Sequence, residues 1–258
     1  MKARPIPPSS DAVSADVVIV GAGSAGCALA HHLSAEASLE VAVLEAGPPD
    51  KAREIHIPPG FVKLFRGELD WSFETEPEPG CDDRRLFWPR GRVLGGSSSI
   101  NAMLYIRGHR RDYDRWQSDY GCDGWTFDEV LPYFKRSQNQ RRGPSELHGV
   151  GGPLEVMDPA YTNPLTRRFV EAGVELGWTA NPDFNGPHQE GIGLYQVNQR
   201  RGRRWSAATG YLHPVLPRPN LKLLTGARAL GLEVTDGRAT GVDVLHGARR
   251  RRVVARRE

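Results

Sequence analysis

The spacing of hydrophobic and polar residues predicts a βαβ unit close to the beginning of the chain. Residues Asp16–Val20 are β-branched and almost wholly apolar, which is typical of a parallel strand buried on both faces. Cys27–Leu33 follows as a predicted helix, and the apolar run Leu39–Leu44 predicts a second strand. This order favours an α/β fold built on a parallel sheet.

Two later segments have the periodicity and start signals of helices. Thr126 and Glu129 have the spacing of a capping box, and they precede an amphipathic helix predicted over Phe127–Lys135. A second helix is predicted to begin at Asn163, which is followed by proline, and to stop at Gly177.

Short apolar runs elsewhere predict strands. Asp70–Glu76 alternates apolar and polar residues and is compatible with a short edge strand, and Gly191–Gln199 is compatible with a strand of a second sheet. Leu221–Leu224 and Ala239–Leu245, separated by a turn at Asp236–Gly237, predict a hairpin.

Composition places the chain among globular proteins of ordinary polarity. It has 258 residues, of which 39% are hydrophobic and 25% charged, enough for one large domain or two small ones. The net charge of +3 comes from local clusters at Arg200–Arg204 and Arg249–Arg257. Neither cluster is interleaved with aromatic residues in a nucleic-acid pattern, so we expect solvated arginines and no nucleic-acid partner.

The cysteines and the first residues indicate a cellular location. Three cysteines, Cys27, Cys81 and Cys122, have no metal-ligand spacing, and such a sparse, odd count suits a reducing compartment. No apolar run is long enough to span a membrane. Residues 1–14 contain prolines where a signal peptide has an apolar region, so we expect a disordered leader and a cytoplasmic protein.

The first predicted strand ends in a glycine pattern that suits a dinucleotide. Gly21 allows a tight turn, Gly23 lets the backbone approach a pyrophosphate, and Gly26 lets helix and strand pack closely. The helix N-terminus offers free N–H groups to phosphates. Glu45, at the end of the second strand, suits a ribose and argues against the 2′-phosphate of NADP. The alternative, an ordinary βαβ unit with a glycine-rich turn, leaves Glu45 unexplained.

A second glycine-rich stretch, PRGRVLGGSSSIN, follows at residues 89–101. Adjacent Gly95 and Gly96, with three serines after them, present N–H and hydroxyl groups that can hold an anion or lie against a planar ring. A flexible linker is the alternative. The apolar residues Val93 and Ile100 on either side favour an ordered loop.

The stretch GRVLGGSSSINAMLYIRGHRRDYDRW resembles the first signature of the glucose–methanol–choline (GMC) oxidoreductases. DWSFETEPEPG and GRRWSAATGYLHP stand in the family's order too. The resemblance implies an α/β fold, a Rossmann-like FAD-binding domain joined to the start of an α+β substrate domain with an antiparallel sheet, incomplete at the C-terminus. The implied divisions are 15–155 for the first part of the FAD domain, 156–210 for the substrate region and 211–258 for the return to the FAD domain.

The family implies FAD rather than NAD, and oxidation of a CH–OH group with hydride transfer to the flavin. Some members attach the flavin through a histidine where this chain has Ile100, so the resemblance implies non-covalent FAD. By resemblance, Ala229 falls at the adenine-contacting position. The residues assigned to FAD are Gly21, Gly23, Ser24, Gly26, Glu45, Val93, Gly96, Asn101, Ala102, Met103, Leu104 and Ala229.

Alcohol oxidation needs a base that takes the hydroxyl proton, and histidine suits that task. In the family this histidine lies in the C-terminal half, which corresponds to positions beyond Glu258. The chain has eight histidines, and none has a spacing to Asp or Glu that suggests a dyad or a metal site. His109, after the loop motif, is expected to have a surface role. We therefore assign no catalytic residue and no metal.

Three interpretations follow. The first is an FAD-dependent, choline dehydrogenase-like alcohol dehydrogenase represented by its FAD-binding N-terminal half, acting on a small alcohol with an electron acceptor that the sequence leaves open. The second is an inactive flavin-binding fragment, or one half of a split enzyme with a complementary C-terminal polypeptide. The third, an NAD-dependent dehydrogenase, does not explain the GMC signature.

Overall fold

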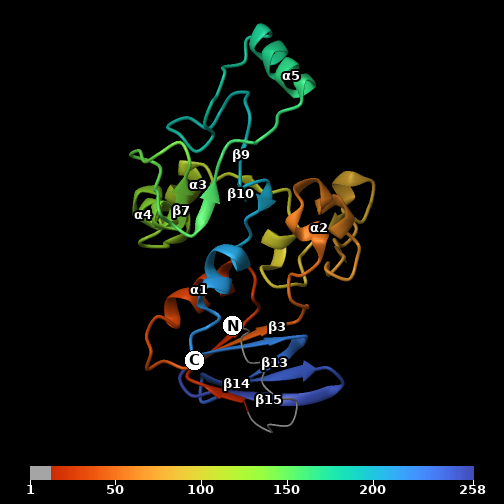
Figure 1. Cartoon of the computed structure of the whole chain (residues 1–258), viewed down its shortest axis with the longest axis vertical. Helices are drawn as coiled ribbons and strands as arrows, with labels where there is room; N and C mark the ends of the chain where they lie inside the picture. The colour runs from red at the N-terminus through yellow and green to blue at the C-terminus, as the bar shows by residue number, and fades with distance from the viewer. Residues whose placement is uncertain (1–12) are drawn as a thin grey trace. The chain divides into compact units, whose positions relative to one another are not determined.

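The computed structural model describes residues 13–258, which form two compact units. The first unit contains the described residues up to Ala102 together with Ser206–Glu258, and the second contains Met103–Trp205 (Figure 1). The divisions that we predicted after residues 155 and 210 lie elsewhere. Strand pairing explains the difference, because Leu104–Tyr105 pairs with Gln196–Val197 and ties residues on both sides of position 155 into one unit.

A three-stranded parallel sheet forms the centre of the first unit. Its strands are β2 (Val17–Val20), β3 (Val41–Glu45) and β12 (Leu221–Thr225), in the order β12-β3-β2. Helix α1 (Ser24–Leu33) connects β2 to β3, as the sequence predicted, but begins three residues earlier because Gly23 is its N-cap. Every residue of β3 is buried, which is typical of the central strand of a parallel sheet.

A second, four-stranded sheet has the order β1-β15-β14-β13. The predicted turn at Asp236–Gly237 is present, but the partner that we predicted for the second strand of the hairpin was wrong. The hairpin joins β13 (Ala227–Thr235) to β14 (Arg238–His246), whereas Leu221–Thr225 enters the parallel sheet. Gly226, in the left-handed region at φ 67°, separates β12 from β13 and lets the chain change sheets.

Both ends of the described chain lie in this second sheet. β1 (Val13–Ala15) pairs in parallel with β15 (Arg249–Ala255), so the prediction of a disordered leader to residue 14 is wrong for Val13 and Ser14. Residues 1–12 lie outside the described residues. The arginine-rich end forms strand β15, and most of its arginine side chains are exposed, as expected. Arg250 also pairs with Asp243, and Arg256 pairs with Asp16 at 3.0 Å. The Arg256 guanidinium lowers the pKa of the Asp16 carboxyl.

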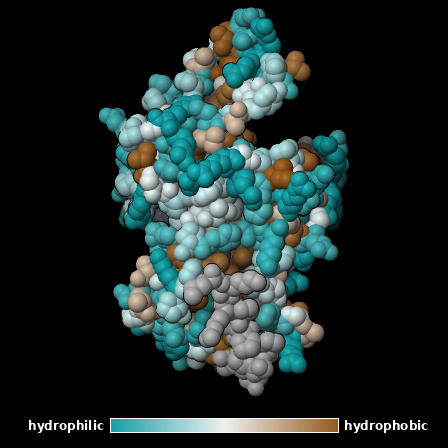
Figure 2. Space-filling view, in the orientation of Figure 1, coloured by the Kyte–Doolittle hydropathy of each residue, from teal (hydrophilic) through white to brown (hydrophobic). Residues whose placement is uncertain are grey.

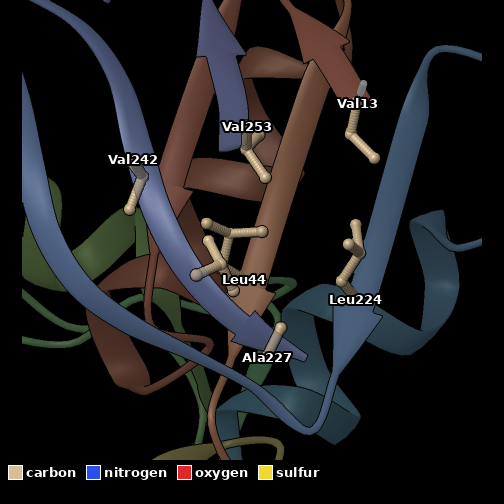
Figure 3. Close-up of a cluster of buried hydrophobic side chains, with 7 residues drawn as sticks. Val13, Leu44, Leu224, Ala227, Val242 and Val253 are labelled. Atoms are coloured by element: carbon tan, nitrogen blue, oxygen red, sulfur yellow. The ribbon is translucent and has the colours of Figure 1, made fainter. Parts of the chain in front are cut away.

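The main core of the first unit lies where the two sheets meet. Leu44 and Leu224 of the parallel sheet contact Ala227, Val242 and Val253 of the other sheet, and their side chains converge in Figure 3. Burial of such side chains is the dominant favourable term in folding. A smaller cluster of Ile55, Leu64, Val93 and Ile100 packs beneath the connecting loops.

Short elements connect the sheets of the first unit. The predicted edge strand at Asp70–Glu76 is reduced to Phe73–Glu74, paired with Phe87–Trp88. The remaining short elements are α2 (Arg53–His56), η1 (Pro58–Leu64), β4 (Phe73–Glu74), η2 (Pro79–Cys81), β5 (Phe87–Trp88), η3 (Gly96–Ser99), η4 (Ala208–Leu212) and η5 (His213–Val215).

The second unit contains three helices and short strand pairs. The capping box of Thr126 and Glu129 is present as predicted, and His109 and Asp112 form another at the preceding helix. The predicted strand over Gly191–Gln199 is broken into two pieces. The elements are β6 (Leu104–Tyr105), α3 (Arg110–Tyr120), α4 (Phe127–Ser137), β7 (Gln138–Gln140), β8 (Leu154–Val156), α5 (Pro164–Glu175), β9 (Gln196–Val197), β10 (Gln199–Arg200) and β11 (Arg203–Arg204).

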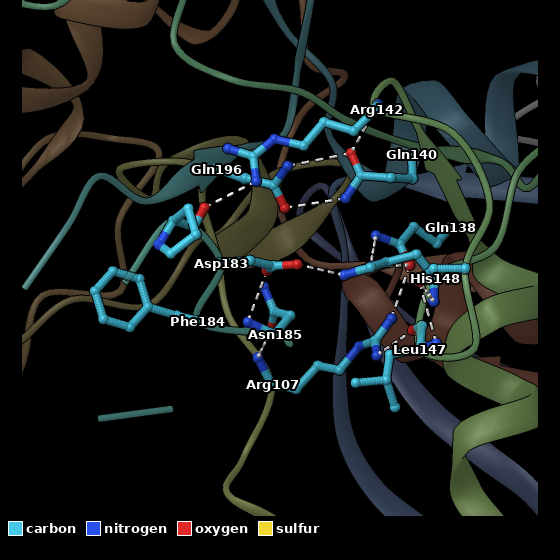
Figure 4. A network of polar contacts seen from close by, with 12 residues as sticks. Arg107, Gln138, Gln140, Arg142, Leu147, His148, Asp183, Phe184, Asn185 and Gln196 are labelled. Carbon is cyan, nitrogen blue, oxygen red and sulfur yellow. Dashed lines mark hydrogen bonds and ion pairs between the residues drawn. The ribbon is translucent and has the colours of Figure 1, made fainter. Parts of the chain in front are cut away.

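Buried polar side chains hold the loops of the second unit together (Figure 4). His148 Nε2 lies 2.7 Å from Asp183 Oδ2, and His148 Nδ1 lies within hydrogen-bond distance of the Gln138 amide. The Arg107 guanidinium donates to Gln138 Oε1 and to the carbonyl of Leu147, at 2.7 Å each. Sequence spacing did not predict the His148–Asp183 pair, because 35 residues separate its members.

The face in Figure 2 is mostly hydrophilic, with apolar residues in scattered groups. Within residues 13–258, no helix combines the length and the apolar character needed to cross a membrane.

The three cysteines are free, and Cys27 is buried, where desolvation raises the pKa of its thiol to about 12.

His213 and Asp50 give the first unit a pH-dependent contact. His213 Nε2 lies 3.1 Å from Asp50 Oδ1, and this hydrogen bond raises the pKa of His213 above its usual value. Because the folded-state pKa is raised, the contribution to stability is fully present below about pH 6.5 and is lost as pH rises through the folded pKa.

We therefore expect His213→Gln to reduce the free energy of unfolding more at pH 6 than at pH 9. Urea denaturation of both proteins at the two pH values measures the difference. His246→Gln is the control, because within the described chain His246 has no carboxylate partner. Equal losses for His213→Gln at both pH values would contradict the assignment.

Candidate functional site

A cavity of about 650 Å³ opens in the first unit where β2 and β3 end and α1 begins. In parallel α/β sheets, ligands bind outside the carboxyl ends of the strands. Of the residues that the sequence assigned to a cofactor, those that line this cavity are Gly21, Gly23, Ser24, Glu45, Gly96 and Ala229.

The turn from β2 into α1 presents backbone to the cavity. Gly21 has a φ of 92°, and its N–H donates to the carbonyl of Leu44 at 2.7 Å, which fixes the turn against β3. Gly23 is the N-cap of α1, and among the described residues no side chain caps this helix. A helix start of this kind leaves N–H groups and a partial positive charge for an anionic ligand.

Gly26 lies behind the turn rather than on the cavity. A Cβ at this position would lie 1.9 Å from the carbonyl oxygen of Gly21 and 3.3 Å from Ile19 Cγ2. A Cβ at Gly23 would meet nothing within 4 Å. The third glycine of the motif therefore serves packing, while the second keeps space open at the cavity.

Glu45 is buried at the end of β3 and touches the motif directly. Its Oε2 accepts the N–H of Ala22 at 2.9 Å, and its Oε1 accepts the N–H of Gly47 at 2.8 Å. Burial raises the pKa of this carboxyl, and the two N–H bonds oppose the shift. Each oxygen has a second lone pair, so the side chain can anchor the loop and still accept from a ligand hydroxyl.

The glycine–serine loop lies against the first motif. The N–H of Gly95 donates to the carbonyl of Ala22 at 2.8 Å, and a Cβ at Gly96 would lie 2.7 Å from the Cα of Gly23. Ser98 Oγ accepts the N–H of Ala207 at 2.9 Å. The segment is therefore an ordered wall of the cavity, and the flexible-linker alternative is wrong.

The other predicted residues lie elsewhere. Val93 is fully buried in the smaller core cluster. Asn101 and Ala102 are exposed, and Ala102 is the last residue of the first unit before the chain enters the second. Met103 and Leu104 belong to the second unit, where Met103 is buried and Leu104 is half-exposed in β6.

Several cavity residues were missed by the sequence analysis. Trp71, Phe73, Arg90 and Arg228 line the cavity beside the predicted residues. The two aromatic residues alternate in the DWSF motif, and Arg228 adjoins Ala229, so both lay next to positions that had been singled out. What the sequence lacks is any sign that these segments meet.

No histidine of the described chain lines this cavity. The structure forms His–Asp pairs that sequence spacing did not reveal, His148–Asp183 in the second unit and His213–Asp50 in the first. Among residues 13–258, no three His, Cys, Asp or Glu side chains gather as a metal site would require.

The cavity has the chemistry of a dinucleotide site: N–H groups for phosphates, glycine where backbone must be close, and an acid for a ribose.

Comparison with known protein families and proteins identifies relatives of this chain. The family model described as GMC oxidoreductase matches residues 15–258. The chain is 49% identical to alcohol dehydrogenase [acceptor] from Pseudomonas putida, over 89% of this chain and 42% of the relative. It is 48% identical to oxygen-dependent choline dehydrogenase from Brucella anthropi, over 95% of this chain and 45% of the relative.

Solved structures give the same result. Pyridoxine 4-oxidase from Mesorbium loti matches with a TM-score of 0.89 and 36% identity, over 94% of this chain and 48% of that one. Formate oxidase from Aspergillus oryzae, studied for its FAD modification, matches with a TM-score of 0.83 and 25% identity, over 96% of this chain and 45% of that one. The chain therefore spans less than half the length of each of these proteins.

Two glycine substitutions separate folding from binding at this site. We expect Gly26→Ala to lower the free energy of unfolding by about 3 kcal/mol, because its methyl group overlaps the backbone of Gly21. Gly23→Ala should leave stability close to that of the wild type, since its Cβ meets open space and its φ of −75° suits alanine. Urea denaturation measures both.

Gly23→Ala is expected to weaken dinucleotide binding instead, because the methyl group occupies space that backbone and pyrophosphate share. Titration with FAD and with NAD, followed by calorimetry, measures this effect. A Gly26→Ala protein as stable as the wild type would contradict the packing role of that residue.

Proposed function

Since the chain belongs to the GMC oxidoreductase family, we propose that it binds FAD non-covalently and is the FAD-binding half of an enzyme that oxidises CH–OH groups. The observation that carries the proposal is the cavity at the ends of β2 and β3, with its glycine turn, uncapped helix start and Glu45. The names of the relatives, an alcohol dehydrogenase and choline dehydrogenases, support a small alcohol as substrate.

The chain's own residues can bind the two ends of the ADP half of FAD. The N–H groups at Gly23 and Ser24 face the phosphates, and Glu45 accepts from the ribose. The strand around Ala229 borders the adenine. FAD, when bound, supplies the acceptor for a hydride from the alcohol carbon.

The flavin end of the proposed site rests on the family resemblance. Gly96 lines the cavity, and we assign Val93, Asn101, Ala102, Met103 and Leu104 to the flavin and ribityl chain by that resemblance. Ile100 stands where some family members have the histidine that attaches the flavin. Its side chain is buried and cannot form that bond, which supports non-covalent binding.

We place the proton-accepting histidine in the part of the relatives that this chain does not cover. The cavity is lined by no histidine within the described residues, and Glu45 is engaged by backbone N–H groups. The relatives' names include both "acceptor" and "oxygen-dependent", so the acceptor that reoxidises the flavin is left open. On this proposal the chain alone binds FAD without turnover.

A complementary C-terminal polypeptide is the proposed partner. Helix α5 supports it, because Leu165, Phe169 and Leu176 at one side of this helix and its end are each more than 70% exposed. Large apolar side chains gathered in this way are typical of surfaces that another chain covers.

Three free cysteines support a reducing compartment, and we propose the cytoplasm.

Two alternatives remain distinct from this proposal. An inactive flavin-binding fragment would bind FAD and stay inactive with any partner. An NAD-dependent dehydrogenase would use the same glycine turn and acid, but the family match over residues 15–258 favours FAD.

The visible spectrum of the purified chain tests the proposal. After incubation with FAD and desalting, we expect the protein to retain flavin absorbance, and anaerobic choline or a small alcohol should not bleach it. Bleaching should appear when a polypeptide equivalent to the C-terminal half of a relative is added.

Each of the other outcomes has a definite meaning. Bleaching by the chain alone would show that a base lies within these 258 residues. If the wild type retains no flavin, and so gives the same spectrum as the Gly23→Ala variant, the FAD proposal is overturned. Retained flavin that no C-terminal partner renders reducible would favour the inactive fragment.

A further inference from the structure

A second cavity, of about 400 Å³, opens within the second unit of the chain, and none of its lining residues belongs to the first unit. We call it the Arg107 cavity, to distinguish it from the dinucleotide cavity at the ends of β2 and β3. Its walls include the turn that leads into α3 and the loop of residues 184–189. The charged side chains that line it are Arg107, Arg110, Arg111 and Glu146, so its wall carries an excess of positive charge.

Arg107 carries a buried positive charge that no acid of the described chain neutralises. The residue is 6% exposed, and its Nη atoms donate to the carbonyl of Leu147 and to Gln138 Oε1, at 2.7 Å each. Nε is buried and has no hydrogen-bond partner within residues 13–258, and the guanidinium forms no ion pair with a carboxylate there. Both acceptors are neutral groups, so they orient the guanidinium without compensating its charge.

The surrounding network keeps Arg107 in this position. Gln138 is fully buried, and its amide also lies within hydrogen-bond distance of His148. The N–H of Arg107 donates to Asn185 Oδ1 at 2.8 Å, and Gln189 Nε2 donates to the carbonyl of Arg107 at 2.9 Å. A buried charge is costly unless a counter-charge compensates it. An anion in the cavity that Arg107 lines would supply this compensation.

A second guanidinium at this cavity is available to a ligand. Arg110 is already compensated, because both of its Nη atoms donate to the carboxylate of Asp128, at 2.7 and 2.9 Å. Arg111 and Glu146 are exposed, and within the described residues neither side chain forms an ion pair. The charges that a ligand would meet are therefore those of Arg107 and Arg111, opposed by that of Glu146.

We propose that the Arg107 cavity binds a small organic carboxylate, and that Arg107 and Arg111 bind its charged group. The guanidinium of Arg107 has N–H donors beyond those used by its two neutral acceptors, and its planar fork matches a carboxylate. The rings of Phe127 and Phe184 also line the cavity, and they suit an apolar body attached to the carboxylate. Because the site lies in the unit without the glycine motifs, the proposal does not depend on FAD binding.

Calorimetric titration with benzoate tests the proposal, because benzoate combines a carboxylate with an apolar ring. We expect saturable binding with a Kd of about 1 mM or tighter, and a higher melting temperature of the chain in its presence. Benzamide has nearly the same shape without the charge, and we expect it to bind at least about tenfold more weakly. Benzamide binding as tight as that of benzoate, or tighter binding of inorganic phosphate than of benzoate, would overturn the proposal.

Two substitutions at exposed positions should change the affinity in opposite directions. Arg111→Gln removes a cation from the wall, and we expect it to weaken benzoate binding about fivefold. Glu146→Gln removes the opposing acid, and we expect it to tighten binding about twofold, which damage to the fold could not do. Arg167→Gln is the matched control for Arg111→Gln, because Arg167 is an exposed arginine of the same unit that does not line the cavity. Thermal denaturation checks that all three variants fold like the wild type.

Arg107→Met tests the buried charge directly. Methionine keeps much of the length of the side chain without its charge, so we expect benzoate neither to bind measurably nor to raise the melting temperature. Wild-type affinity in a folded Arg107→Met protein would overturn the proposal. If this variant does not fold, the exposed positions decide: an affinity in Arg111→Gln equal to that in Arg167→Gln, or weaker binding in Glu146→Gln, would overturn it.

The Gly23→Ala variant separates this site from the dinucleotide cavity. It is expected to bind FAD weakly, but it should bind benzoate like the wild type, because Gly23 belongs to the first unit. Loss of benzoate binding in Gly23→Ala would overturn the placement of the site in the second unit.

Discussion

The close approach of three backbone segments is the constraint on which the first unit depends. A Cβ at Gly26 would lie 1.9 Å from the carbonyl oxygen of Gly21, and one at Gly96 would lie 2.7 Å from the Cα of Gly23. A Cβ at Gly91 would lie 2.2 Å from the carbonyl oxygen of Gly96. Because no side chain fits between these segments, helix α1, the turn before it and the glycine–serine loop form one surface of backbone groups.

Two buried carboxylates fix the loops that surround this surface. Glu45 binds the N–H groups of Ala22 and Gly47, and Asp70 binds those of Arg66, Ser72 and Arg90. Burying a charge is costly unless hydrogen bonds compensate for it, and here the backbone supplies them. The result is a preformed cavity whose walls come from five separate parts of the chain. Of these two carboxylates, only Glu45 lines the cavity.

The dinucleotide cavity and the buried polar network lie in different units of the chain, although the family match covers both. The glycine motifs and the cavity lie in the first unit, and the second unit has its own buried network around Arg107, Gln138 and His148. The chain spans less than half the length of its relatives. Within the described residues no histidine lines the dinucleotide cavity, and Leu165 and Phe169 of α5 are exposed.

The sequence by itself determined whatever depends on neighbours along the chain. The glycine spacing, the capping box at Thr126 and the turn at Asp236–Gly237 are local signals, and each produced the predicted structure. Tertiary structure alone decided which strands pair. It placed Leu221–Thr225 in the parallel sheet, gave the arginine-rich end a partner in β1, and brought Trp71 to Arg228 and His213 to Asp50. These contacts join residues more than 100 positions apart, and period and spacing carry no information about such pairs, because the energy that selects them arises only when the sheets pack.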